Sequence, residues 1–63
     1  MSKKQEITEQ EVIEAAIDFY GDKQMEINRH NENGREYVEA VPVGETSQYG
    51  APRFFLDFFE IKS

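Results

Sequence analysis

Near its C-terminus the chain reads Arg53-Phe54-Phe55-Leu56-Asp57-Phe58-Phe59-Glu60-Ile61, a stretch that holds four of its five phenylalanines. Successive side chains of a strand point to opposite faces, so this stretch predicts a strand that is apolar on both sides. The side chains expected to pack beneath a helix are Phe54, Leu56 and Phe58. Those expected on the exposed face are Phe55, Phe59 and Ile61. The i, i+4 spacing of the phenylalanines would also suit a helix, but the aromatic content and the entry through Ala51-Pro52 favour a strand.

A helix is predicted at the other end of the chain, over about residues 9–20. Thr8 and Glu11 have the spacing of a capping box, in which each side chain bonds to the backbone N–H of the other residue. Apolar residues follow at helical intervals, namely Ile13, Ala16, Ile17 and Tyr20, and Gly21 stands where a left-handed cap is favoured. Residues 1–6 are polar and lack periodic apolar positions, so we expect a flexible tail there.

Two strands joined by a tight turn are predicted between residues 24 and 43. Met25 and Ile27 alternate with polar residues, which is the pattern of a half-buried strand. The turn lies at Asn31-Glu32-Asn33-Gly34, and the second strand runs from about Arg35 to Val43.

The register of this hairpin has two alternatives. A two-residue turn on Asn33-Gly34 sets Ile27 opposite Ala40, whereas a bulged type I turn sets Met25 opposite Val41. A slip of one residue exchanges the two faces of the second strand. We favour the bulged turn, because it gathers Met25, Val41 and Tyr37 on one side.

A polar loop over residues 44–52 connects the hairpin to the Phe-rich strand. The order of elements is then α-β-β-β. We expect an α+β fold with one N-terminal helix packed on a three-stranded antiparallel sheet, in a single domain over residues 7–63.

Composition limits the classes of function. The chain has 63 residues and no cysteine, so disulfides and thiolate metal sites cannot stabilise it. No stretch suits a secretory signal or a membrane span, so we expect a cytoplasmic protein. A net charge of -6 opposes direct binding to nucleic acid or to anionic membranes. Partners are expected to be basic or apolar.

The acidic residues are concentrated at the start of the chain. Between Gln5 and Asp22 there are six acidic residues and no basic one. Glu11, Glu14 and Asp18 share one helix face through their three- and four-residue spacing. Such a row of carboxylates suits a protein that imitates the phosphates of DNA. The more ordinary explanation is a solvated face of an amphipathic helix, whose early acids complement the helix dipole.

Residues with catalytic or metal-binding potential are sparse. His30 is the only histidine and has no cysteine partner, so a metal site is not expected. The segment 31–36 resembles a calcium loop faintly, but a hairpin turn accounts for it. A chain of this length offers no deep cleft that could tune paired carboxylates. We expect neither an enzyme nor a cofactor.

The predicted function is therefore protein binding. Tyr49 and Arg53 are of the residue types enriched at interface hot spots. In size and composition the chain resembles small acidic proteins of phages and mobile elements that block host proteins. We expect an inhibitor that occupies a basic surface of a nucleic-acid-handling protein, and the alternative is a homodimer or larger assembly built on the Phe-rich strand. The predicted partner-binding residues are Glu11, Glu14, Asp18, Tyr49, Arg53, Phe55, Phe59 and Ile61.

Overall fold

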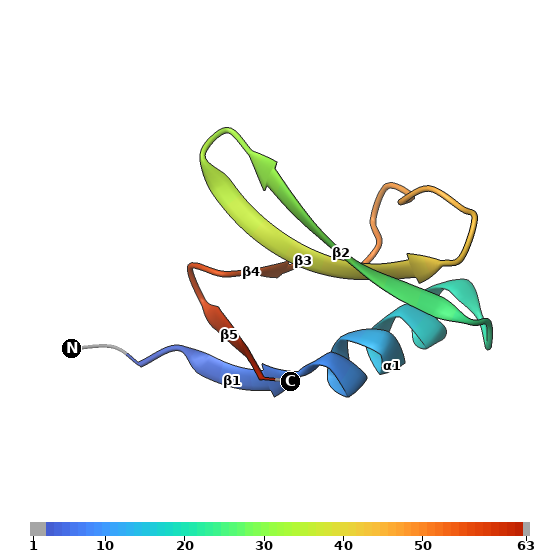
Figure 1. Ribbon diagram of the computed structural model, residues 1–63, viewed down its shortest axis with the longest axis horizontal. Helices are drawn as coiled ribbons and strands as arrows, with labels where there is room; N and C mark the ends of the chain where they lie inside the picture. The colour runs from blue at the N-terminus through green and yellow to red at the C-terminus, as the bar shows by residue number, and fades with distance from the viewer. Residues whose placement is uncertain (1–2, 63) are drawn as a thin grey trace.

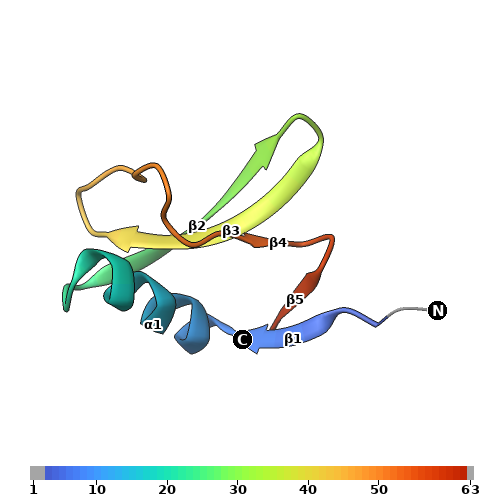
Figure 2. The ribbon, with the colours of Figure 1, turned by 180° about the vertical axis from the view of Figure 1, so that it is seen from behind.

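The computed structural model describes residues 3–62 (Figures 1 and 2). Its elements, in chain order, are β1 (Gln5–Thr8), α1 (Glu9–Tyr20), β2 (Met25–Glu32), β3 (Arg35–Pro42), β4 (Phe54–Phe55) and β5 (Phe59–Lys62). Strands β2, β3 and β4 form an antiparallel sheet with β3 in the middle, and β1 pairs with β5 in a second, parallel sheet. The predicted α+β fold, with one helix on a three-stranded antiparallel sheet, is confirmed, and the parallel pair is an addition to it.

The capping signals of α1 act as the sequence predicts. The Thr8 hydroxyl accepts from the backbone N–H of Glu11 at 3.1 Å, and the Glu11 carboxylate accepts from the backbone N–H of Thr8 at 2.7 Å. The helix ends at Tyr20, and the N–H of the capping Gly21 donates to the carbonyl of Ile17 at 2.8 Å. Gly21 has a φ of 100°, which suits glycine, but its ψ of 174° differs from that of the left-handed cap that we expected. The helix bounds follow from these local contacts.

The hairpin register differs from the one we favoured. Ile27 lies opposite Ala40 and Arg29 opposite Val38, so the turn is the two-residue one on Asn33-Gly34. Both turn residues have positive φ, 54° and 83°, as a type I′ turn requires. Such a turn follows the natural twist of the two strands, which a bulged type I turn matches less directly. The bulged register was therefore wrong, and Val38 and Ala40, rather than Tyr37 and Val41, face the helix.

The start of the chain is more ordered than predicted. Gln5 and Glu6, expected in a flexible tail, belong to β1, and the first two residues of that tail lie outside the described residues. The backbone N–H of Gln5 donates to the carbonyl of Phe58 at 3.0 Å, and Ile7 is only 4% exposed. The burial of Ile7 and the ladder to β5 hold this segment in place.

The Phe-rich stretch is not one strand. A turn after β4, closed by a bond of 3.0 Å from the N–H of Phe58 to the carbonyl of Phe55, separates β4 from β5. The turn shifts the alternation, so Phe58 is 61% exposed although we expected it beneath the helix. Phe59 and Ile61 pack against the core although we expected them on the exposed face. A single strand with apolar side chains on both faces would need another element packed on each face. The turn divides the stretch into two short strands, so this requirement does not arise.

Two different covers enclose β3. The core lies between α1, β1 and one face of the sheet, and its buried members are Ile7, Val12, Ala16, Val38 and Ala40. On the other face Tyr37, Glu39 and Val41 are buried too. In Figure 1 α1 lies below the sheet, whereas the loop that follows β3 arches above it. Within residues 3–62, no helix has the length and apolar character that crossing a bilayer demands.

Candidate functional site

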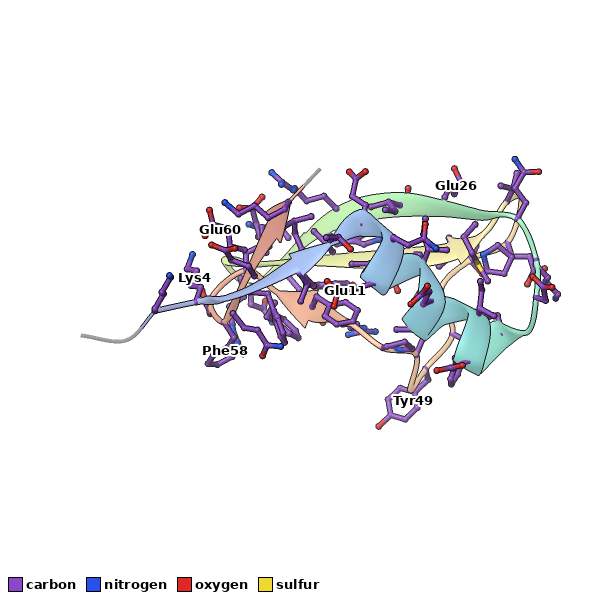
Figure 3. The ribbon with its side chains drawn as sticks, turned by 90° about the horizontal axis from the view of Figure 1, so that it is seen from below. Lys4, Glu11, Glu26, Tyr49, Phe58 and Glu60 are labelled. Atoms are coloured by element: carbon purple, nitrogen blue, oxygen red, sulfur yellow. The ribbon has the colours of Figure 1, made fainter. Side chains whose placement is uncertain are left out.

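Three predicted carboxylates share the outer surface of α1. Glu11, Glu14 and Asp18 are all exposed, whereas Val12 and Ala16, each 1% exposed, occupy the inner side of the same helix. A rise of about 1.5 Å per residue spaces the three positions by roughly 5 Å along the helix axis. Figure 3 looks onto this side of the molecule, with α1 in front of the sheet. We call these three residues the acidic face of α1.

The ion pairs of the described chain leave the acidic face unneutralised. The exposed acids that do pair lie elsewhere: Glu45 with Lys23 at 3.2 Å, Asp57 with Arg35 at 3.1 Å, Glu32 with Arg53 at 3.6 Å, and Glu6 and Glu60 with Lys62 at 3.9 and 3.3 Å. Within residues 3–62 no Lys, Arg or His nitrogen lies within 4.0 Å of a carboxylate of the acidic face. Negative charge is therefore concentrated along α1, although Glu11 also serves in the capping box.

Tyr49 protrudes from the loop between β3 and β4. Its side chain is 98% exposed, and Figure 3 shows it pointing away from the molecule. The loop is attached to the helix directly before this residue, because the N–H of Gln48 donates to the hydroxyl oxygen of Tyr20 at 3.1 Å. Tyr20 is the last residue of α1. The structure therefore links the acidic face and Tyr49 through the end of the helix.

Arg53 and Phe55 are involved in contacts within the chain. The Arg53 guanidinium lies 4.9 Å from the ring centre of Tyr37, and the ring of Phe55 lies 5.2 Å from that same ring. Arg35 in turn lies over Phe55 at 4.5 Å. These two predicted binding residues cover the loop-side face of β3 and do not join the acidic face.

Phe59 and Ile61 do not belong to an exposed site, since both pack against the core. Phe58 takes the exposed place that the sequence assigned to them. The turn at residues 56–58 reverses which side chains of the stretch point towards the core. Asp57 is the only polar residue in this turn. One polar residue was too weak a signal for a turn to be predicted from the alternation of side chains.

A buried carboxylate that sequence reasoning missed lies on the loop-side face of β3. Glu39 is 1% exposed, and its Oε1 accepts from the hydroxyl of Ser47 at 2.7 Å. The Nε2 atom of His30 lies 3.0 Å from Oε2, yet Oε2 accepts no hydrogen bond from residues 3–62. The contact between His30 and Glu39 is therefore one of proximity. His30 also stacks on Tyr37, with ring centres 5.1 Å apart.

These groups do not form a hydrolytic triad. The hydroxyl of Ser47 donates a hydrogen bond to the carboxylate of Glu39, so its proton is not directed at His30, the residue that would have to act as the base. Within residues 3–62 there is no pocket and no group of three His, Cys, Asp or Glu residues suited to a metal ion. The arrangement of Ser47, Glu39 and His30 holds the loop in place.

No protein-family model matches this chain, and neither a curated protein nor a solved structure was found to match it.

Proposed function

We propose that this protein binds a basic surface of another protein through the acidic face of α1. The observation that supports the proposal is the row of three exposed carboxylates without a basic neighbour in the described chain. Charges presented in this way steer encounter with a positively charged partner and fix its register.

Tyr49 supplies the apolar part of the contact. An exposed tyrosine offers a large ring and a hydroxyl at little entropic cost, because it has few rotatable bonds. Its loop makes a hydrogen bond to Tyr20, the last residue of the helix that carries the carboxylates. The site then combines long-range charge attraction with a short-range aromatic contact.

The kind of partner follows from the charge pattern. A surface that binds a row of carboxylates at roughly 5 Å spacing also suits the phosphates of nucleic acid, and such surfaces are rich in lysine and arginine. We propose a nucleic-acid-handling protein as the partner, with this chain as an inhibitor that competes with the nucleic acid.

The alternative, self-assembly through the Phe-rich strand, has less support. It required a row of apolar side chains on a free strand face, and Phe59 and Ile61 pack inward instead. Phe58, in the turn between β4 and β5, is the one large exposed hydrophobic side chain between Arg53 and Ile61.

The test is affinity capture from nuclease-treated lysate of the source or host cells. The wild-type chain is compared with a triple variant, Glu11→Gln, Glu14→Gln and Asp18→Gln, which replaces each carboxylate by a neutral amide. We expect the wild-type chain to retain a basic nucleic-acid-binding protein at low salt, and to lose it at about 1 M salt, where screening acts within about 3 Å. We expect the triple variant to retain at least tenfold less.

A second step tests competition. The captured protein, once purified, should bind its nucleic acid less tightly in the presence of the wild-type chain and not in the presence of the triple variant. Equal recovery of the same proteins by the two chains would show that the acidic face is only a solvated surface. Circular dichroism of the triple variant is the control for folding.

A further inference from the structure

The loop that carries Tyr49 is tied to β3 by a contact that the binding proposal does not use. Ser47 and Gln48, the two residues before Tyr49, each make one anchoring hydrogen bond. The Ser47 hydroxyl donates to Glu39 at 2.7 Å, and the Gln48 N–H donates to the Tyr20 hydroxyl at 3.1 Å. The loop is thus fixed at two consecutive residues, to the sheet and to the helix.

The turn that follows Tyr49 is closed by a hydrogen bond to Gln48, the residue that is also bonded to Tyr20. The N–H of Ala51 donates to the carbonyl of Gln48 at 3.2 Å, and Gly50 between them has φ of 89°, which a residue with a side chain rarely adopts. Ala51 itself is 8% exposed. Tyr49 therefore has fixed backbone on both sides, while its ring is free.

The burial of Glu39 couples the loop to the sheet. A buried carboxylate is costly unless neighbouring donors replace the water that it has lost. Ser47 is the hydrogen-bond donor that the loop supplies, and Glu39 Oε2 accepts no hydrogen bond from residues 3–62. If Ser47 loses its hydroxyl, Oε1 is left buried without that donor, and opening of the loop is the way in which water can reach it.

We propose that Glu39 is a positioning residue that, through Ser47, holds Tyr49 ready for contact with a partner. This inference rests on the proposed function in one respect, namely that Tyr49 touches the partner. A contact residue that is ordered before binding avoids the entropy cost of being ordered on binding. Tyr20 contributes the second anchor, so the latch consists of Glu39, Ser47 and Tyr20.

The first experiment measures the motion of the free protein by ¹⁵N relaxation. In the wild-type chain we expect the amide of Tyr49 to have an order parameter near the rigid value of about 0.85, and in Ser47→Ala to fall below about 0.6. Ser47→Thr keeps the hydroxyl and should restore the rigid value. Thr46→Ala is the matched control, since Thr46 makes no side-chain hydrogen bond within residues 3–62. An order parameter of about 0.85 for the Tyr49 amide in Ser47→Ala would overturn the proposal that Ser47 holds Tyr49 in place.

The second experiment measures the affinity for the basic protein recovered in the capture experiment. Ser47→Ala should weaken binding by about threefold to tenfold, the range expected when one side chain must be ordered on binding. In a Tyr49→Ala background the same substitution should have no further effect, because the residue that the latch positions is gone. An equal loss in both backgrounds would overturn the positioning role.

Failure of the two proposals can be told apart. The relaxation experiment needs no partner, so it decides on the latch by itself. If the triple glutamine variant binds as well as the wild-type chain while Tyr49 still loosens in Ser47→Ala, the proposed function fails and the latch stands.

Discussion

The two faces of β3 are covered by different kinds of interaction. On the helix side Val38 and Ala40 pack against Val12 and Ala16 of α1 in a purely apolar contact. On the loop side the carboxylate of Glu39 is buried beside the hydroxyl of Ser47 and the ring of His30.

This difference has a consequence for stability. Apolar packing is non-directional and grows with the area removed from water, so the helix side supplies most of the free energy of folding. Hydrogen bonds are directional and contribute little net free energy, yet leaving one unmade is costly. We therefore expect the helix side to decide whether the chain folds and the loop side to decide how the loop is held.

The largest effect is expected from Val12→Asp, on the helix side. The substitution places an unpaired carboxylate in the core, at a cost of several kcal/mol. The whole stability of a chain of this length is about 3 to 9 kcal/mol. Circular dichroism should therefore show an unfolded chain at room temperature. Glu14→Gln, on the outer side of the same helix, is the control, and a native spectrum for Val12→Asp would show that Val12 is not in the core.

A smaller effect is expected from a substitution at Phe59, which is partly buried against the core. Phe59→Ser should lower the free energy of unfolding by about 2 kcal/mol or more, because full removal of a buried phenylalanine costs about 3 to 5 kcal/mol and Phe59 is partly buried. Phe58→Ser, one residue earlier, should change it by less than about 0.5 kcal/mol. Urea unfolding of both variants gives the comparison. A larger loss for Phe58→Ser than for Phe59→Ser would contradict the turn between β4 and β5 and would favour an uninterrupted strand over residues 53–62.

The smallest of these effects is expected on the loop side. Glu39→Ala should lower the free energy of unfolding by about 1 to 2 kcal/mol, since its partners Ser47 and His30 can be rehydrated once it is gone. Glu36→Ala, at an exposed position of the same strand, is the matched control and should be nearly neutral. A loss for Glu39→Ala as large as that for Phe59→Ser would mean that the loop side carries as much stability as the core.

The helix side of the fold was largely predictable from the sequence. The capping box at Thr8 and the glycine at position 21 act locally, so their spacing was sufficient to set the helix. The strands of the hairpin followed from alternation. Their register did not, because both faces of residues 37–41 carry apolar side chains and each register offered a plausible core.

The loop side was not predictable. The burial of Glu39 depends on the register and on Ser47, a serine in a loop with no local signal. Strand β1 was missed because Ile7 is its one apolar residue and its pairing partner lies at the other end of the described chain. For the candidate site, the position of the carboxylates on α1 followed from helical spacing, whereas Phe59 and Ile61 were misplaced because the alternation of side chains along a strand cannot reveal the turn before them.

The parallel pairing of β1 with β5 affects how the protein is made. Thr8 lies beside Lys62, so β1 leaves the ribosome well before β5, the strand with which it pairs. Until then Ile7 lacks its neighbour Ile61 and stays exposed on the nascent chain, although α1 and the hairpin can already form from local contacts. The parallel pair can therefore form only after β5 has been synthesised, and a stall in translation before residue 59 would leave Ile7 exposed and available to chaperones.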